Sequence, residues 1–195
     1  MKVAKLSGSL RENVGKKSAK ALRSSNQVPA VIYGSDKQIH IAINDLDVEK
    51  IVFTPEVYQV DIEIDGKTVS TIIQDIQQDP ITDKVRHIDF LQLDSSKPVK
   101  VGLPVRLVGN SRGVMAGGKL LQVFRRLTVV GLPSQLPDAI TIDITKLRIG
   151  FSIRVGQIET DGLRFLEPAN AVVVAVKMAR GAAKGSDADE EEEEA

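Results

Sequence analysis

The sequence predicts a mainly β protein, in which an N-terminal six-stranded barrel with short helices precedes a C-terminal antiparallel β-domain. Apolar and polar residues alternate along most segments, turn residues separate these segments at short intervals, and only two short stretches carry helix signals. The 195 residues suffice for one large domain or two small ones. Hydrophobic residues make up 42% and charged residues 27%, an ordinary balance for a globular protein.

Six strands and two short helices are expected in the first domain, residues 1–94. Good helix formers follow Ser18, which can cap them, and predict a helix over 19–25. Asn44 is an N-cap candidate for a second helix over 45–53. Asp65-Gly66 is a strong signal for a type I′ hairpin between two of the strands. The expected strands are 3–10, 30–33, 38–43, 57–64, 67–76 and 85–93.

A domain boundary is predicted just after Asp94, where the polar stretch Asp94-Ser95-Ser96-Lys97-Pro98 is rich in turn residues. The second domain, residues 95–180, is expected to be an antiparallel β-domain. Residues 181–195 include five consecutive Glu and no apolar residue larger than Ala, so we expect a disordered acidic tail. The expected strands of the second domain are 99–108, 120–132, 140–144, 152–158 and 171–176.

The composition argues against an enzyme. There is no Cys and only two His, His40 and His87, which excludes thiolate nucleophiles, cysteine metal sites and multi-His metal sites. Gly109-Asn110-Ser111-Arg112-Gly113 matches the nucleophile elbow of serine hydrolases, but both His precede Ser111, whereas that fold places its His after the Ser. We therefore expect a non-enzyme with no cofactor, no metal and no small-molecule substrate.

No apolar run approaches the roughly 20 residues needed to cross a bilayer. The first residues also lack the apolar core of a signal peptide. We expect a cytoplasmic protein with no membrane partner.

Charge is segregated along the chain although the formal net charge is zero. Residues 1–40 carry eight Lys and Arg against two acidic residues, and residues 95–180 carry thirteen against five. Acidic residues dominate 41–94 and the tail. The two basic segments are the places to expect a polyanionic partner.

The N-terminal basic segment is the first part of a candidate RNA-binding site. Cationic side chains within and just before a helix can neutralise phosphates, and a helix N-terminus also favours anions. A stacking ring, donors and acceptors on strands can read the base edges and 2′-hydroxyls of RNA. The cationic candidates are Arg11, Lys16, Lys17, Lys20 and Arg23, and the strand candidates are Tyr33, Gln74, Gln77, His87 and Asp89.

These residues resemble a known family. Arg11 to Arg23, with Gly15-Lys16 inside it, is followed by Pro29-Ala30-Val31-Ile32-Tyr33-Gly34, and then by Gln74-Asp75-Ile76-Gln77 and His87-Ile88-Asp89-Phe90. In this order the motifs resemble the bacterial 5S-rRNA-binding ribosomal protein family (L-twenty-five). The second half resembles that of the long form of the family, the general stress protein Ctc.

The resemblance implies a barrel that binds the loop E helix of 5S rRNA in the central protuberance of the large ribosomal subunit. It implies a protein that is monomeric within the ribosome and has neighbouring ribosomal proteins as partners. The RNA contacts of the family map onto Arg11, Lys16, Lys20, Arg23, Tyr33, Gln74, His87 and Asp89. Lys20 stands where many members have Arg, which keeps the charge but loses the planar fork.

Three points stay open at the level of the sequence. Asp89 can accept a hydrogen bond from RNA or orient His87. The function can also be that of a stress-induced protein-interaction adaptor, or of an RNA-binding stress protein that does not reside on ribosomes. The partner of the second domain, with its excess of basic residues, is not defined by any motif.

Overall fold

The computed structural model describes residues 1–34, 37–158, 160 and 162–178. The tail expected to be disordered, 181–195, lies outside the described residues. The described chain forms two compact units, one of Met1–Val101 with Val130–Asp138 and the other of Gly102–Val129 with the chain from Ala139 onward. The domain ranges 1–94 and 95–180 stay a prediction.

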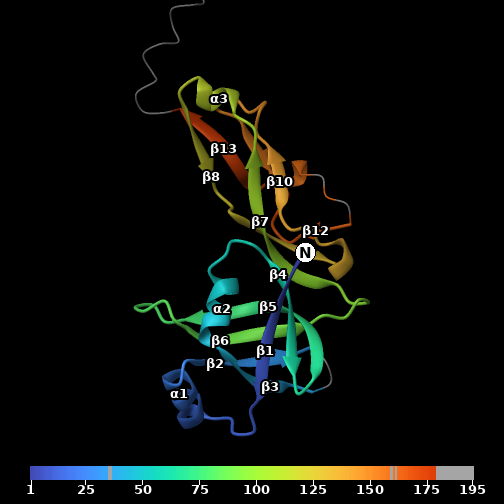
Figure 1. The fold of residues 1–195 in the computed structure, drawn as a ribbon. Helices are drawn as coiled ribbons and strands as arrows, with labels where there is room; N and C mark the ends of the chain where they lie inside the picture. Colours follow the sequence, from blue (N-terminus) through green and yellow to red (C-terminus); the bar gives the residue numbers. More distant parts are fainter. Residues whose placement is uncertain (35–36, 159, 161, 179–195) are drawn as a thin grey trace, which may run out of the picture. The chain divides into compact units, whose positions relative to one another are not determined.

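The first unit contains a closed barrel of six strands in the order β1-β3-β2-β6-β5-β4 (Figure 1), which confirms the predicted barrel. Two pairs, β1 with β4 and β2 with β6, are parallel, and the other pairs described are antiparallel. The strands are β1 (Lys2–Leu10), β2 (Gln27–Tyr33), β3 (Ile39–Asn44), β4 (Tyr58–Ile64), β5 (Lys67–Gln78) and β6 (Val85–Gln92).

The barrel core is filled by aliphatic side chains and one aromatic ring. Because side chains alternate between the two faces of a strand, every second residue points inward. Ala30, Ile32, Ile88 and Phe90 are fully buried in this core, together with Val48 from the helix α2 (Asp45–Val52). The residues between them on β2 and β6 therefore face outward, and they carry the polar groups described below.

Two local predictions for this unit are confirmed. Asn44 caps α2, since its side-chain Oδ1 accepts a hydrogen bond from the backbone N–H of Leu46 at 3.2 Å. Asp65 and Gly66 form the two-residue turn between β4 and β5, and both have positive φ, as a type I′ turn requires.

The first helix begins earlier than predicted. α1 spans Lys16–Ser24, so Ser18 lies within its first turn and does not cap it. Gly15 occupies the N-cap position and offers no side-chain acceptor. The helix consequently exposes its first backbone N–H groups without a side-chain cap, which suits an anion.

The second unit consists of two small sheets, with strand orders β10-β7-β9-β12 and β11-β13-β8 (Figure 1). The mainly β character predicted for this half is confirmed, although β10 runs parallel to β7. The strands are β7 (Val99–Val108), β8 (Gly118–Gln122), β9 (Arg126–Gly131), β10 (Ile140–Asp143), β11 (Ser152–Arg154), β12 (Arg164–Phe165) and β13 (Val172–Met178). The helical elements of this unit are α3 (Arg112–Met115) and the short 3-10 turn Val155–Gln157, and the 3-10 turn Pro133–Gln135 belongs to the first unit.

The single strand predicted over 120–132 is in fact two strands, β8 and β9, which belong to different sheets. The chain turns between them, and the amide of Gln122 donates to the backbone oxygen of Phe124 at 3.2 Å across this turn. Val123 and Phe124 continue the apolar run into the turn, but Arg125 and Arg126 interrupt it, a local signal that the prediction of one strand overlooked.

Candidate nucleic-acid interface

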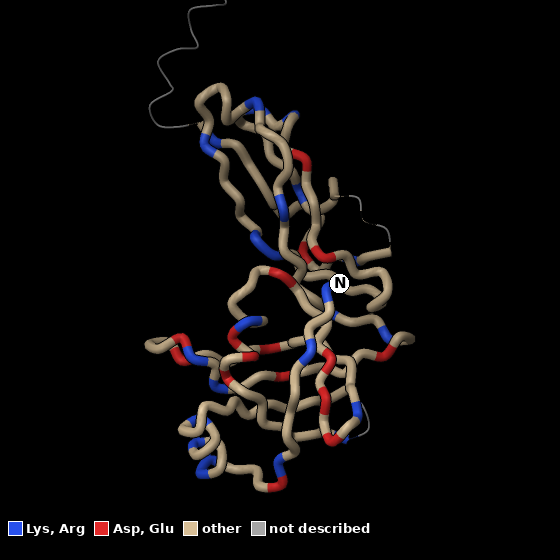
Figure 2. The backbone as a smooth tube through the Cα atoms, viewed as in Figure 1, with Lys and Arg blue, Asp and Glu red and all other residues tan. Residues whose placement is uncertain are grey.

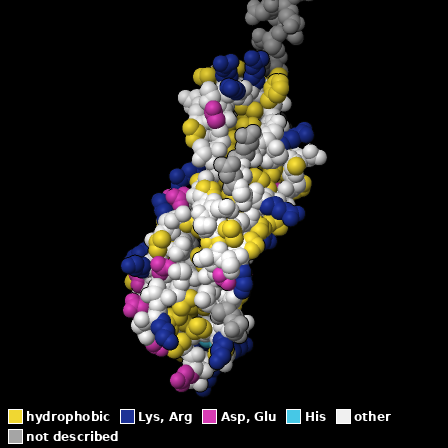
Figure 3. All heavy atoms as spheres, turned by 90° about the vertical axis from the view of Figure 1, so that its right-hand side faces the viewer, with side chains coloured by type: hydrophobic (Ala, Val, Ile, Leu, Met, Phe, Trp, Pro, Cys, Tyr) yellow, Lys and Arg dark blue, Asp and Glu magenta, His cyan; other side chains and the backbone are white. Residues whose placement is uncertain are grey.

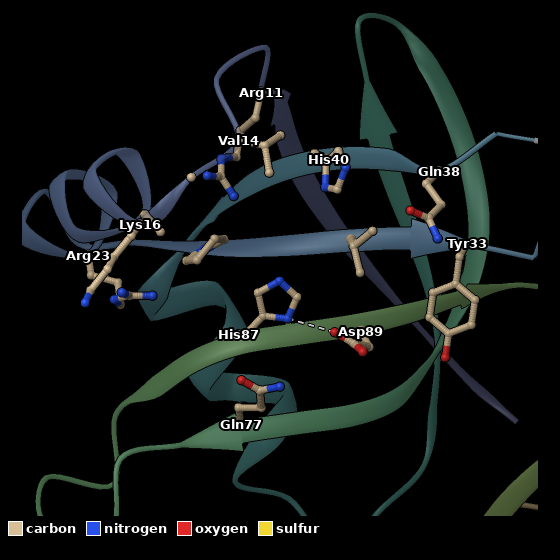
Figure 4. A pocket seen from close by; sticks show the side chains of 14 residues that line it. Arg11, Val14, Lys16, Arg23, Tyr33, Gln38, His40, Gln77, His87 and Asp89 are labelled. Carbon is tan, nitrogen blue, oxygen red and sulfur yellow. Dashed lines mark ion pairs between the residues drawn. The ribbon is translucent and has the colours of Figure 1, made fainter.

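A hollow of about 660 Å³ lies on the outside of the barrel, over β2, β3 and β6 and beside α1 (Figure 4). The pairing register of the strands shows which residues form the floor of the hollow. Val31 on β2 lies opposite His40 on β3 and opposite Asp89 on β6. Ala30 and Ile32 point into the core, so Val31 between them faces outward. Val31, His40 and Asp89 therefore form a row across the outer face of the barrel.

Seven of the ten predicted site residues line this hollow. They come from four parts of the chain: the end of β1, the helix α1, the strand β2 and the hairpin of β5 and β6. The seven residues are Arg11, Lys16, Arg23, Tyr33, Gln77, His87 and Asp89.

One side of the hollow is cationic. Lys16, Ala19 and Arg23 line it from α1, and residues three and seven positions apart lie on one face of a helix. The guanidinium of Arg23 donates to the backbone oxygen of Arg86 at 3.3 Å, which holds this side chain against β6. The buried Nε of Arg11 has no hydrogen-bond acceptor among the described residues. A buried donor without an acceptor is costly, so a ligand oxygen at this point would stabilise the site.

The opposite side carries an imidazole, carboxylates and a phenol. His87 Nδ1 and Asp89 Oδ1 are 2.7 Å apart, an ion-pair distance when the imidazole is protonated, and both side chains are 31% exposed. Burial and then the charges of Asp89 and Asp75 raise the pKa of Tyr33. The phenol therefore stays protonated at neutral pH and can donate a hydrogen bond. Figure 4 shows Tyr33 and Asp89 on the side of the hollow away from Lys16 and Arg23.

Three predicted residues do not line the hollow: Lys17, Lys20 and Gln74. Lys17 and Lys20 are exposed on other parts of the α1 surface. Gln74 lies at an irregularity in β5, where the register with β6 shifts between Ile73 and Asp75. Gln74 is the extra residue at this irregularity: it is exposed, as is Asp75, but Asp75 takes the position opposite Asp89.

The sequence-based prediction missed two polar lining residues, Gln38 and His40. A signal for both was present. Alternation in this strand puts Ile39, Ile41 and Ile43 on one face, which leaves Gln38 and His40 on the other. What was missing is the pairing of β3 with β2, which brings that second face beside Val31.

The described part of the chain contains no cluster of three or more His, Cys, Asp or Glu that could hold a metal ion. Ser111, the serine of the elbow-like motif, is 2% exposed and donates its hydroxyl to the backbone oxygen of Leu147 at 2.7 Å. A buried and hydrogen-bonded hydroxyl is a structural group, as expected for an accidental motif match. Within the described ranges, no helix is both long and apolar enough to span a membrane.

Comparison with known proteins defines the class of protein. Residues 6–90 match the model of the ribosomal L25p family, and residues 98–180 match that of the C-terminal domain of ribosomal protein TL5. A large ribosomal subunit protein bL25 of Phocaeicola vulgatus is 40% identical over 189 residues, covering 93% of this chain and 96% of its own. The bL25 protein of Parabacteroides distasonis is 39% identical over 193 residues, covering 96% and 99%.

The chain therefore belongs to the ribosomal L25p family, a family of large-subunit ribosomal proteins. This confirms the resemblance inferred from the motifs between Arg11 and Phe90. Because the relatives are structural proteins of the ribosome, the prediction of a non-enzyme is also confirmed.

Proposed function

We propose that the chain is a structural component of the large ribosomal subunit and that its barrel binds 5S rRNA at the loop E region, in the central protuberance. Its partners are then 5S rRNA and neighbouring ribosomal proteins, and it is cytoplasmic and ribosome-associated. The observation that carries the proposal is the two-sided hollow, cationic on the α1 side and rich in polar acceptors and donors on the β6 side.

The cationic side supplies affinity. Arg11, Lys16 and Arg23 approach phosphates, and the uncapped N-terminus of α1 adds backbone donors. Lys17 and Lys20 are exposed on the same helix and contribute to the field around it at longer range. Phosphate contacts of this kind position a protein on a helix without reading its sequence.

The β6 side supplies discrimination. His87, Gln77 and Tyr33 offer donors, and Asp89 accepts from a base amino group or a 2′-hydroxyl. Asp89 lies within 2.7 Å of His87, so it also orients the imidazole. Two carboxylates, Asp75 and Asp89, keep phosphates away from this side and so fix which way the RNA lies. Gln74 is exposed at the rim of this region and is a peripheral contact.

A competition gel shift with the full chain tests the proposal. The probe is a loop E fragment of 5S rRNA, and the competitor is a perfectly paired duplex of equal length. We expect the loop E fragment to be bound in preference at moderate salt. Equal affinity for both RNAs would contradict the assignment of loop E as target.

Sedimentation of cell extracts tests the ribosomal location separately. A protein of the large subunit sediments with that subunit and is released at high salt, because its RNA contacts are largely ionic. Sedimentation as a free protein in all conditions would favour the alternative of an RNA-binding stress protein away from the ribosome.

A further inference from the structure

The second unit carries an exposed phenylalanine in a cationic setting. Phe151 is 64% exposed and lies at the rim of a hollow of about 420 Å³, which Lys146, Arg148, Ile153 and Gln157 also line. The hollow has the size of a small-ligand site. It belongs entirely to the second unit and is separate from the hollow on the barrel.

Hydrogen bonds hold the backbone that carries this ring. Gly150 N–H donates to the oxygen of Val176 at 2.8 Å, and the oxygen of Phe151 accepts from Val176 N–H at 3.1 Å. Phe151 N–H donates to Arg148 at 3.2 Å. The ring is therefore presented on a fixed backbone, which lowers the entropic cost of binding a partner.

The segment before the ring is anchored as well. The backbone oxygen of Leu147 accepts from Ser111 Oγ at 2.7 Å and from Gly113 N–H at 2.9 Å. A Cβ on Gly113 would come within 2.7 Å of the backbone of Arg148, so only glycine permits this close approach. Arg148 and Phe151 consequently stand on a supported loop.

Cations at this end of the unit lack acidic partners. Lys119 on β8 lies directly opposite Lys177 on β13, and like charges in that position repel each other. Among the described residues, Arg112, Lys119, Lys146, Arg148 and Lys177 form no ion pair. Figures 2 and 3 show Lys and Arg gathered at this end of the unit, around α3 and the end of β13. Of these five cations, Lys146 and Arg148 line the hollow of Phe151.

One carboxylate, that of Asp143, lines the hollow, and it is engaged in local hydrogen bonds. Asp143 accepts hydrogen bonds from the hydroxyl and the backbone N–H of Thr145, and these lower its pKa. It closes a local turn, and the charge of nearby Lys146 also lowers its pKa. Arg148 is the cation of this lining that forms no ion pair among the described residues.

We propose that this hollow binds one unpaired nucleotide of an RNA strand, with the base stacked on Phe151 and the flanking phosphates on Arg148 and Lys146. Unstacked bases are commonly held on aromatic rings with cations along the backbone. The ring offers a base a stacking surface, and the separated cations beside it suit the flanking phosphates. The site is distinct from the proposed loop E interface and does not depend on it.

Phenylalanine-labelled NMR on the full chain tests the site directly, because the sequence contains only five Phe residues. The probe is a single-stranded oligoadenylate, and its control is the same phosphodiester chain without bases. We expect the Phe151 ring signals to shift upfield with the oligoadenylate, and the affinity read from them to fall at least fivefold with the abasic chain. Equal affinity for both probes would overturn base stacking.

Phe53 provides an internal control, since it is 56% exposed but lies at the C-terminal end of α2, in the other unit. Its signals should stay fixed. In Arg148→Gln the affinity read from Phe151 should fall about threefold or more, while the spectrum of the free protein stays unchanged. Shifts of Phe151 with an acidic apolar peptide but not with RNA would overturn the proposal in favour of a protein partner.

The His signals keep the two sites distinguishable. His40 and His87 are the only histidines and both line the barrel hollow. An RNA that moves them and leaves Phe151 unmoved at saturating concentration supports the loop E interface and overturns the second site. An RNA that shifts the Phe151 signals and leaves both His signals unmoved supports the second site and contradicts binding at the barrel hollow.

Discussion

Asp75 and Asp89 lie directly opposite each other on β5 and β6, on the outer face of the barrel beside Tyr33. Facing like charges weaken a strand pair, so this arrangement costs stability. Its effect is to give the hollow a negative side opposite the cations of α1. The charge of the surface is therefore positive on the α1 side and negative on the opposite side. This arrangement suits a ligand that presents phosphates on one side and base edges on the other.

The pKa of Tyr33 is sensitive to the carboxylates on this negative side. Its raised pKa keeps the phenol protonated in the folded protein to a higher pH than in the unfolded chain. The folded state then binds more protons, so this group's contribution to stability is present below the ordinary pKa of about 10 and is lost as pH rises through the folded value. In a Tyr58→Phe background, tyrosinate absorbance should show Tyr33 titrating above its ordinary value, and Asp89→Asn should lower its pKa. An unchanged pKa in Asp89→Asn would show that its charge does not act on Tyr33.

Phosphate contacts and groove contacts should separate by salt dependence. Lys16→Ala should weaken binding of loop E and plain duplex alike and reduce the slope of log K against log salt by about 0.7–0.9. His87→Ala should leave the slope nearly unchanged and lower the preference for loop E about tenfold, the effect of losing a hydrogen bond of roughly 1.4 kcal/mol. Fluorescence anisotropy at several salt concentrations measures both. Identical behaviour of the two variants would refute the division of roles.

The Asn44 cap should matter to stability. Asn44→Ala removes the acceptor of the Leu46 N–H and should lower the free energy of unfolding by about 1 kcal/mol in urea denaturation. Ser18→Ala is the matched control, because Ser18 makes no cap to α1 and its loss should change stability by less than about 0.5 kcal/mol. A larger loss in Ser18→Ala than in Asn44→Ala would contradict the observed helix starts.

Gly34 should not tolerate a side chain. Its φ of 109° disfavours other residues, and an added Cβ would lie 2.9 Å from Leu91 Cδ1. Gly34→Ala should cost about 1–3 kcal/mol and also weaken RNA binding, because Tyr33 precedes it directly. Gly102→Ala, where no atom lies within 4 Å of the added Cβ, is the control and should be nearly neutral. Thermal unfolding and anisotropy of both variants check this, and equal stability would refute the strain at Gly34.

The sequence predicted much of the barrel because its signals are local. Alternation marked the strands, and Asn44 and Asp65-Gly66 marked a helix start and a hairpin. The parallel pairing of β1 with β4 joins residues more than fifty positions apart, and no local pattern carries that information. The same holds for the pairing of β3 with β2, which brings His40 into the site.

Three further differences between prediction and structure are confined to single positions in the chain. The register shift leaves Gln74 as an extra exposed residue and puts Asp75 opposite Asp89, which strict alternation does not anticipate. α1 starts at Lys16, before the serine that looked like its cap. The turn after Gln122 divides the stretch predicted as one strand between two sheets, and the charged pair Arg125 and Arg126 marks the break.

The most direct test of the barrel hollow as the RNA interface follows its two histidines, the only ones in the chain. Histidine-labelled NMR spectra of the full chain are recorded during titration with the loop E fragment and with a paired duplex of equal length. We expect the imidazole signals of His40 and His87 to shift and saturate with loop E, and to shift less with the duplex. Tight binding of loop E with both signals unmoved would contradict the account.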